Sequence, residues 1–152
     1  MCTPCHAPHG SDSARLLRYY FVEKFYKPFN PDLYTLCFKC HKETLVEAKE
    51  TTVLTNFRNG SLNLHYLHVH REKGRTCLAC HEVHAGFQEK LVRRSTPFGD
   101  WQIPVEFIKT PTGGKCALSC HVPKAYDREK PVKLDADNPP VRSRVKGGKR
   151  AG

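Results

Sequence analysis

The sequence is poor in the residues that fill an ordinary protein core. Its 152 residues include two isoleucines and one methionine, Met1, and 39% of them are hydrophobic. With glycine counted in place of tyrosine, the apolar share is about 41%, against about 45–50% in ordinary globular chains. A chain of this length forms one domain or two small units. Its all-protein core would be thin.

Long hydrophobic runs are also missing. The longest apolar stretch, residues 16–22, is interrupted by Arg18, whereas a membrane helix needs about 20 predominantly apolar residues. Cys2 follows Met1 directly, without a charged and then apolar leader, so we expect no signal peptide in this sequence. We therefore expect a processed or trimmed chain, or a piece of a longer one.

Cysteine and histidine are abundant instead, with eight and nine copies. The cysteines form four pairs, and a histidine follows the second cysteine of each pair. The groups are Cys2, Cys5 and His6; Cys37, Cys40 and His41; Cys77, Cys80 and His81; and Cys116, Cys120 and His121. Three groups have the spacing C-x-x-C-H, the attachment sequence of c-type haem, and the fourth has one extra residue. Two thiols about one turn apart reach the two porphyrin vinyl groups, and the adjacent imidazole binds the iron. The pattern predicts four covalently bound haem c groups.

Two other uses of paired cysteines fit the pattern less well. Structural zinc sites also use C-x-x-C pairs, but they do not need a histidine directly after the second cysteine of every pair. A disulfide scaffold tolerates any residue after each pair. The histidines therefore favour haem over both alternatives.

The remaining histidines provide second ligands for the four irons. They are His9, His65, His68, His70 and His84. Apart from Met1 the chain has no methionine, which excludes histidine–methionine ligation within it. We expect all four irons to be six-coordinate with two histidines each, which predicts low potentials and no vacant position.

Spacing narrows the choice of second ligands. His9 follows His6 by three residues, and His84 follows His81 by three. A ring at that spacing cannot reach the far face of its own haem, so it would bind the iron of a neighbouring haem. His65 and His68 share helical spacing, whereas His68 and His70 share strand spacing. We favour His65 and His68 as ligands, with His70 as the alternative.

The motifs recur about once per 38 residues, which suggests packed repeats. We expect one tetrahaem domain over residues 1–138 and a basic, disordered tail over 139–152. Residues 44–49 are predicted to form a short helix, and residues 98–112, with their prolines, loop and extended chain. The tail carries five of the ten net positive charges, and haem propionates would offset most of the rest, so the charge does not indicate nucleic-acid binding.

The sequence resembles the multihaem c-type cytochromes of the doubled-CXXCH kind, found in metal-reducing and related anaerobic bacteria. The similarity lies in the four cysteine motifs, the C-H-x-x-H runs ending at His9 and His84, and the L-H-x-x-H run at 64–68. In that family such histidines are distal ligands, which carries over to His9, His84, His65 and His68, and the C-x-x-x-C-H variant is tolerated. The expected fold class is a small multihaem cytochrome c, mostly irregular loops with short α-helices wrapped around a chain of haems and little β-sheet.

This resemblance implies an electron conduit in the periplasm or at the cell surface, and no enzyme. The expected partners are other redox proteins or multihaem cytochromes, including copies of this chain in a filament and an outer-membrane conduit. The alternative is a subunit of a multihaem oxidoreductase of the nitrite or hydroxylamine reductase type. Such an enzyme needs an open iron position and usually a distinct catalytic haem, for example at a C-x-x-C-K motif, which this sequence lacks.

Overall fold

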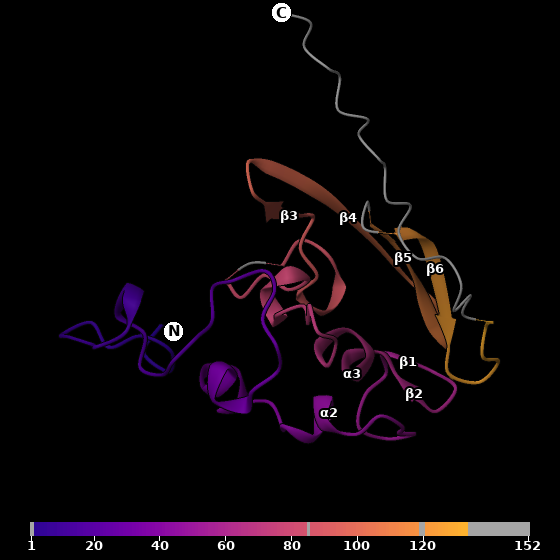
Figure 1. Ribbon diagram of the computed structural model, residues 1–152, viewed down its shortest axis with the longest axis horizontal. Coiled ribbons are helices and arrows are strands. Elements are labelled where there is room, and N and C mark those ends of the chain that lie inside the picture. Colours follow the sequence, from indigo (N-terminus) through magenta and orange to yellow (C-terminus); the bar gives the residue numbers. More distant parts are fainter. Residues whose placement is uncertain (1, 85, 119–120, 134–152) are drawn as a thin grey trace, which may run out of the picture.

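The computed structural model describes residues 2–84, 86–118 and 121–133 (Figure 1). The first part of the chain holds short helical segments: η1 (Ala14–Leu16), η2 (Pro31–Tyr34), α1 (Thr35–Phe38), α2 (Thr44–Glu47), α3 (Leu64–Val69), η3 (Cys77–Ala79) and η4 (Glu89–Leu91). A small hairpin of β1 (Arg58–Asn59) and β2 (Leu62–Asn63) precedes α3. None of the described helices is long and apolar enough to cross a membrane.

The later part of the chain is an antiparallel sheet, which the sequence did not predict. Its four strands follow chain order: β3 (Ser95–Phe98), β4 (Trp101–Lys109), β5 (Gly113–Leu118) and β6 (His121–Asp127). The expectation of little β-sheet was therefore wrong, and residues 98–112, expected as loop and extended chain, contain the strand β4. Pro97 lies on the edge strand β3, and Pro104 pairs with Ser95 at the start of that strand. Proline is tolerated at such sheet margins, so prolines here did not exclude strands.

Asn63 holds the helical part together. Its side-chain oxygen accepts hydrogen bonds from the backbone N–H groups of His65 and Tyr66, at 3.0 and 3.3 Å, and so caps α3. Its amide nitrogen donates to the carbonyls of Leu45 and Ala48, both at 2.9 Å, at the end of α2. Asn63 is fully buried, so this one side chain fixes where α3 begins relative to α2.

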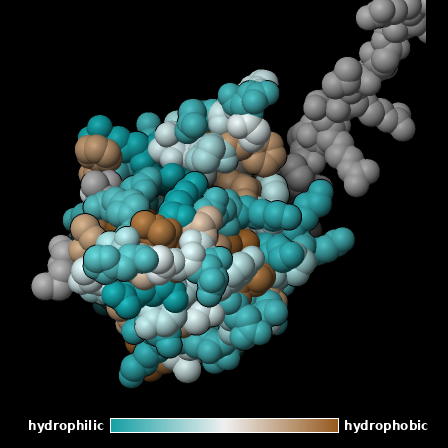
Figure 2. Space-filling view, turned by 90° about the vertical axis from the view of Figure 1, so that its left-hand side faces the viewer, coloured by the Kyte–Doolittle hydropathy of each residue, from teal (hydrophilic) through white to brown (hydrophobic). Residues whose placement is uncertain are grey.

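The protein core is thin, as the composition predicts. Its buried hydrophobic residues are Val22, Tyr34, Val46, Leu64, Val69, Ala79, Val105 and Tyr126. Large apolar side chains also lie at the surface, and the face in Figure 2 is mostly hydrophilic with small hydrophobic patches between. Two of the exposed leucines, Leu16 and Leu91, belong to the loops that follow cysteine motifs. A bound prosthetic group would bury such side chains and supply the missing core.

The first cysteine motif and the sheet lie at opposite ends of the molecule. The N-terminal loop extends to one side in Figure 1, and strands β5 and β6 lie on the other. The helical segments between them carry the second and third motifs. The tail expected over residues 139–152 lies outside the described residues.

Candidate functional site

Three of the four cysteine motifs fold into the same backbone turn. We number the motifs along the chain: motif 1 (2–6), motif 2 (37–41), motif 3 (77–81) and motif 4 (116–121). In motifs 1 to 3 the N–H groups of the second cysteine and of the histidine both donate to the carbonyl of the first cysteine. The distances are 3.2 and 3.0 Å in motif 1, 3.2 and 3.0 Å in motif 2, and 3.2 and 2.9 Å in motif 3. This turn keeps the two thiols about one helical turn apart with the imidazole directly after them.

Motifs 1 and 3 also share the loop that follows them. We call these units clip 1 (residues 2–18) and clip 2 (residues 77–84 and 86–93). Ala7 N–H donates to the carbonyl of Leu16 at 2.7 Å, and Glu82 N–H donates to that of Leu91 at 2.8 Å. The chain then returns to the motif, where Arg18 N–H donates to Cys5 and Arg93 N–H to Cys80, at 2.8 and 3.0 Å. The two clips are therefore one structural unit that occurs twice.

Each clip closes on the ring of its motif histidine. Two successive residues in each loop adopt left-handed backbone angles: Arg15 and Leu16 in clip 1, and Lys90 and Leu91 in clip 2. That conformation is uncommon for residues other than glycine. In this conformation the carbonyl of Arg15 accepts from His6 Nδ1 at 2.9 Å, and the carbonyl of Lys90 accepts from His81 Nδ1 at 3.1 Å.

These hydrogen bonds fix the tautomer of the motif histidines. A carbonyl can only accept, so Nδ1 carries the proton and Nε2 keeps its lone pair. Metal-binding histidines typically donate their other N–H in this way. His68 Nδ1 donates to the carbonyl of Leu64 at 2.6 Å, and His121 Nδ1 to that of Val122 at 2.7 Å. In their neutral form, His6, His68, His81 and His121 therefore all keep the Nε2 lone pair, through which an imidazole can bind a metal.

Two motif histidines face a second histidine at the distance that a shared metal requires. The ring centroids of His6 and His84 are 6.1 Å apart with the planes 16° from parallel, and those of His65 and His81 are 6.4 Å apart at 24°. A metal binds an imidazole nitrogen at about 2.0–2.1 Å, and the ring centre lies about 1.1 Å behind it, so two imidazoles on opposite sides of one metal have centroids about 6.3 Å apart. The centroid distances of both pairs are therefore compatible with one metal ion between the two rings.

His65 and His68 are buried, and burial keeps them neutral. It lowers the pKa of His65 to about 4, with a further contribution from the charges of His81, His68 and His41. Burial likewise lowers the pKa of His68 to about 4, and Arg75, Arg71 and His121 add to this effect. Neutral imidazole is the form that binds a metal. His65 Nδ1 lies 3.1 Å from the hydroxyl of Thr55, which orients the ring.

Motif 4 has a different backbone from the other three. Cys116 lies on β5, where it pairs with Phe107 of β4, and His121 opens β6, where it pairs with Leu118. The register of β5 and β6 shifts between Cys116 and Leu118, in the place where motif 4 has its extra residue. Cys120, the remaining predicted thiol of this motif, lies outside the described residues.

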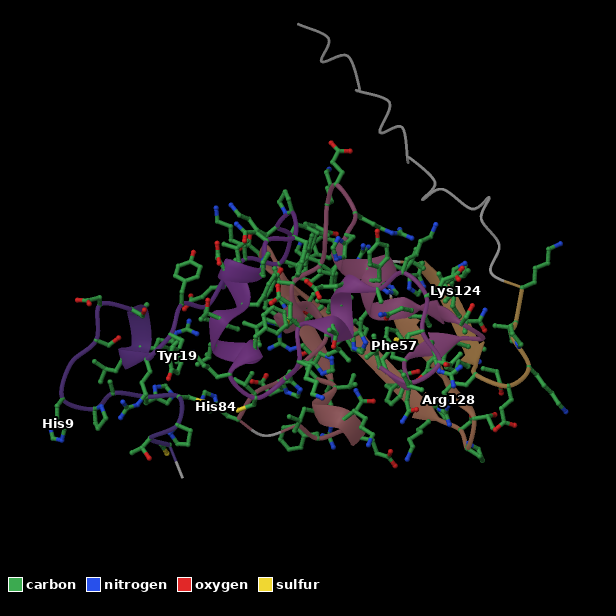
Figure 3. All side chains as sticks on the ribbon, turned by 90° about the horizontal axis from the view of Figure 1, so that it is seen from below. His9, Tyr19, Phe57, His84, Lys124 and Arg128 are labelled. Carbon is green, nitrogen blue, oxygen red and sulfur yellow. The ribbon has the colours of Figure 1, made fainter. Side chains whose placement is uncertain are left out.

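His70 and His9 differ from the histidines above. His70 Nε2 donates to the carbonyl of Val46 at 3.0 Å, and its ring packs on Tyr66 and Phe29, with centroids at 4.3 and 4.4 Å. This arrangement uses the nitrogen that a metal would need. His9 is exposed at the end of the molecule (Figure 3). Among the described residues no histidine ring packs against His9 or against His41 of motif 2.

Motifs 2 and 3 meet at their first cysteines. A hydrogen bond between the two thiols lowers the pKa of Cys37 and raises that of Cys77. Tyr34 lies beside them, and burial, assisted by both thiols, raises its pKa to about 12. Its buried hydroxyl has no hydrogen-bond partner among the described residues. An unpartnered buried hydroxyl next to two cysteines of haem-attachment motifs fits a site completed by a prosthetic group.

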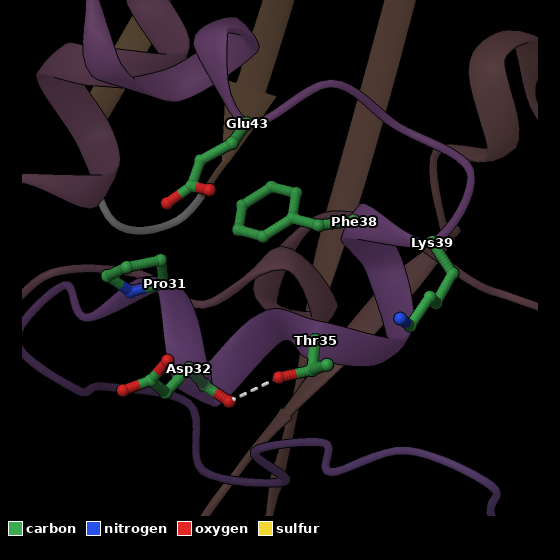
Figure 4. A pocket seen from close by; sticks show the side chains of 6 residues that line it. All are labelled: Pro31, Asp32, Thr35, Phe38, Lys39 and Glu43. Atoms are coloured by element: carbon green, nitrogen blue, oxygen red, sulfur yellow. Dashed lines mark hydrogen bonds between the residues drawn. The ribbon is translucent and has the colours of Figure 1, made fainter.

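A hollow of about 200 Å³ lies on the outer side of motif 2 (Figure 4). Its lining is Pro31, Asp32, Thr35, Phe38, Lys39 and Glu43. Thr35 is held there by a 2.8 Å hydrogen bond from its hydroxyl to the carbonyl of Asp32. The described residues contain no cluster of three or more His, Cys, Asp or Glu side chains that would hold a bare metal ion. Among the described residues, the candidate metal donors are therefore paired histidines.

Sequence reasoning missed three contributors to this site. Phe57 packs against both His65 and His68, with centroids at 5.0 and 5.8 Å, and Thr55 orients His65. The third is the pair of carbonyls that fix His6 and His81. One signal was available, because the clips share the pattern C-x-x-C-H-x-x-H followed by a basic residue, leucine, leucine or valine, and arginine. For Phe57 and Thr55 nothing in the local pattern marks a role.

Comparison with known proteins bears on the first part of the chain. A family model described as "Doubled CXXCH motif" matches residues 1–45, which contain motifs 1 and 2. This segment is therefore a c-type haem-binding segment. No curated protein and no solved structure matches the chain.

Proposed function

We propose that the chain is a tetrahaem c-type cytochrome that transfers electrons among closely spaced haems held by pairs of histidines. The observation that carries the proposal is the pairing of rings. His6 and His84, and His65 and His81, stand 6.1 and 6.4 Å apart, in each case with one histidine from a C-x-x-C-H motif. The match of residues 1–45 to the doubled CXXCH motif supports the same chemistry independently.

The residues present fit covalent haem. The motif cysteines supply thioether bonds, the motif histidines keep Nε2 for the iron, and Tyr34, Leu16 and Leu91 offer side chains for the porphyrin to cover. Haem supplies a one-electron couple between iron(III) and iron(II). Two neutral imidazoles would hold the iron with the same ligands in both oxidation states, so the protein would need little rearrangement when an electron arrives.

We propose three pairs of histidine ligands within the chain. His84 completes the motif 1 haem with His6, and His65 completes the motif 3 haem with His81. His68 is proposed to complete the motif 4 haem, since its ring and that of His121 both have Nδ1 bound to a carbonyl and keep Nε2 for a metal. The motif 2 haem would have His41 as its one histidine, because no second histidine ring packs against His41 among the described residues.

The competing function is a multihaem reductase, and His41 is the position that bears on it. A reductase needs one iron with an open coordination position, and His41 is exposed. In the proposed assignment three irons have two histidines each and one iron has a single histidine, which nonetheless favours electron transfer as the main role. Binding of carbon monoxide to the reduced protein tests whether the motif 2 iron has an open position, as described below, whereas turnover of nitrite or hydroxylamine would identify a reductase.

Location and partners follow from the haem chemistry. Cytochromes with c-type haem are typically exported, so we propose a periplasmic or cell-surface role. The partners would be other redox proteins, including multihaem cytochromes or further copies of this chain in a conduit or filament.

The first experiment is a pyridine haemochrome assay with intact mass on protein matured in a periplasm that attaches c-type haem. The proposal expects four covalent haems per chain and an electron paramagnetic resonance spectrum dominated by low-spin iron(III). Three haems would remove motif 4, with its longer spacing, from the set. Protein that binds zinc and no haem would overturn the proposal.

A further inference from the structure

We propose that Thr55 is a positioning residue of the motif 3 haem, whose hydroxyl holds the ring of His65 and sets the reduction potential of that iron. The inference rests on the proposed function, in which His65 and His81 are the two ligands of the motif 3 iron. It adds a residue that controls one of these ligands. The contacts that carry it join the loop before β1 to the start of α3.

Thr55 is the hydrogen-bond partner of the His65 ring. Its hydroxyl oxygen lies 3.1 Å from His65 Nδ1, and the threonine is 8% exposed, so water competes little for this contact. When Nε2 binds a metal it carries no proton, so the proton of the neutral ring lies on Nδ1 and the hydroxyl oxygen accepts the hydrogen bond. Nε2, on a different edge of the ring, then remains for the iron.

The backbone around Thr55 is fixed to the same helix. Phe57 N–H donates to the Thr55 hydroxyl oxygen at 3.0 Å, and the carbonyl of Phe57 accepts from the N–H of Leu64, the first residue of α3, at 3.0 Å. The Phe57 ring lies edge-on to the His65 ring, with centroids 5.0 Å apart and the planes at 73°. His65 is thus held by Thr55 at Nδ1 and by Phe57 against the ring, which limits rotation of the ring about a bond to the iron.

A hydroxyl at this position distinguishes His65 from other candidate ligands. Four histidines donate Nδ1 to a backbone carbonyl instead: His6, His68, His81 and His121. The Thr55 oxygen already accepts the N–H of Phe57, so both of its lone pairs are used once His65 donates to it. A hydrogen bond at Nδ1 raises the basicity of a metal-bound imidazole. A hydroxyl whose lone pairs are shared in this way raises that basicity less than a carbonyl does.

The acceptor at Nδ1 affects the balance between iron(III) and iron(II). A more basic imidazole donates more charge and stabilises iron(III), which lowers the potential. On the motif 3 iron, His81 would be the stronger donor, because the Lys90 carbonyl accepts its Nδ1–H at 3.1 Å, and His65 would be the weaker one. Removal of the Thr55 hydroxyl would leave the His65 Nδ1–H without its acceptor and raise the potential further. The couple itself transfers one electron, with no ligand gained or lost.

Thr55→Val tests this inference against a matched control in the same loop. Valine keeps the shape of threonine and removes the hydroxyl. Thr51→Val is the control, because Thr51 is also buried and its hydroxyl oxygen accepts the N–H groups of Val53 and Leu54, at 3.2 and 2.9 Å. In the part of the chain that the structure describes, Thr51 makes no hydrogen bond to a histidine. Both substitutions remove the acceptor of a backbone N–H, so they should cost similar stability. Thr55→Ser keeps the hydroxyl and is the conservative variant.

Redox titration of the haem-loaded protein, followed by proton NMR, measures the midpoint of each haem. The motif 3 haem is identified through contacts of its His65 ligand with Phe57. We expect Thr55→Val to raise this midpoint by about 30 mV, a threefold change in the equilibrium constant at about 59 mV per tenfold. The electron paramagnetic resonance signal of this iron should also shift or broaden, because the signal depends on the angle between the two ligand rings. Thr51→Val and Thr55→Ser should match the parent protein. No change in Thr55→Val, or an equal change in Thr51→Val, would overturn the inference.

A measurement on the parent protein decides the inference if Thr55→Val does not fold. Low-spin iron(II) is diamagnetic, so the Nδ1 proton of His65 can be observed by NMR in the reduced protein. It should show a nuclear Overhauser contact with the Thr55 side chain and exchange slowly with water, because this hydrogen bond is buried. An Nδ1 proton without contact to Thr55 would overturn the inference. A parent protein without covalent haem at motif 3, or with high-spin iron there, would instead contradict the proposed function.

Discussion

The ring of His65 lies nearly parallel to that of His81, with their centroids 6.4 Å apart, although the two residues belong to different segments. His65 stands in the first turn of α3, whose start is fixed by Asn63, and His81 ends a turn whose loop returns to hold its Nδ1. A histidine pair of this kind joins a histidine that is oriented by hydrogen bonds within its own segment to a second histidine that lies beside it only in the tertiary fold.

Replacement of His84 should change one haem from low to high spin. His84→Ala removes the ring that faces His6 at 6.1 Å, so the motif 1 iron would keep one histidine. In the electron paramagnetic resonance and visible spectra of the iron(III) protein, the high-spin share should rise by about a quarter of the haem relative to the parent protein. His9→Ala is the matched control, because His9 also follows a motif by three residues but lies exposed, and its spectrum should match that of the parent. An unchanged His84→Ala spectrum would remove this residue from the ligand set.

Substitution of His68 and substitution of His70 should affect the haem spectra differently, because His68 is proposed as an iron ligand and His70 as a packing residue. His68→Ala is expected to produce one high-spin haem. His70→Ala should leave the haem spectra unchanged, because its Nε2 is bound to the carbonyl of Val46 and its ring packs on Tyr66 and Phe29. Loss of that packing and hydrogen bond should lower the free energy of unfolding by about 1–3 kcal/mol. The reverse pattern of spectra would make His70 the ligand.

The reduced protein should bind one carbon monoxide per chain, at the motif 2 haem. His41 is the motif histidine left unpaired in the part of the chain that the structure describes, whereas the other irons have two histidines each in the proposed assignment. Carbon monoxide titration followed in the Soret band measures the stoichiometry. The same titration of His84→Ala should give two per chain. No binding to the parent protein would show that a sixth ligand already reaches the motif 2 iron.

Asn63→Ala should destabilise the fold strongly. The substitution removes the cap of α3 and two hydrogen bonds to the end of α2 in a fully buried position, which predicts a loss of about 2–4 kcal/mol in the free energy of unfolding. Asn30→Ala is the control, because Asn30 caps η2 by a single 3.0 Å bond to the N–H of Asp32 at an exposed position, and it should cost about 1 kcal/mol or less. Urea unfolding measures both. Equal losses would mean that burial of Asn63 adds nothing.

Acid should weaken the end of the sheet through Asp127. The N–H of Lys130, the hydroxyl of Thr112 and the N–H of Glu129 donate to this carboxylate and lower its pKa. The folded state therefore binds its proton less readily than the unfolded chain, so the contribution of Asp127 is complete above its ordinary pKa near 3.8 and is lost as the pH falls through the lowered value. Melting temperatures measured between pH 6 and pH 2 should fall less steeply in Asp127→Asn. Identical pH profiles would exclude a contribution from this group.

Motif chemistry was predictable from sequence because it depends on local spacing. The c-type haem-binding segment at residues 1–45 is confirmed, and the predicted helix over 44–49 is present as Thr44–Glu47. The pairing of His84 with His6 depends instead on the approach of distant segments, which spacing alone does not determine. The sheet was missed because prolines at 97, 104 and 111 indicate loops. Here Pro97 lies on an edge strand, Pro104 lies inside β4 just before its pairing with β5 begins, and Pro111 lies between strands. Burial of Val105, which stabilises that sheet, has no local signal.

The repeated clips set an order of assembly. Every hydrogen bond that closes a clip joins residues of one short segment, whereas the ring that faces His6 comes from the other clip. Local contacts form sooner than distant ones because less chain entropy is lost in closing them. Each clip would therefore form its cysteine turn and orient its motif imidazole before the tertiary structure forms, and haem could be attached at that stage. Haem attachment and conversion of the iron to low spin would then be separate events. The spectral change from high to low spin during maturation would report when the tertiary structure forms.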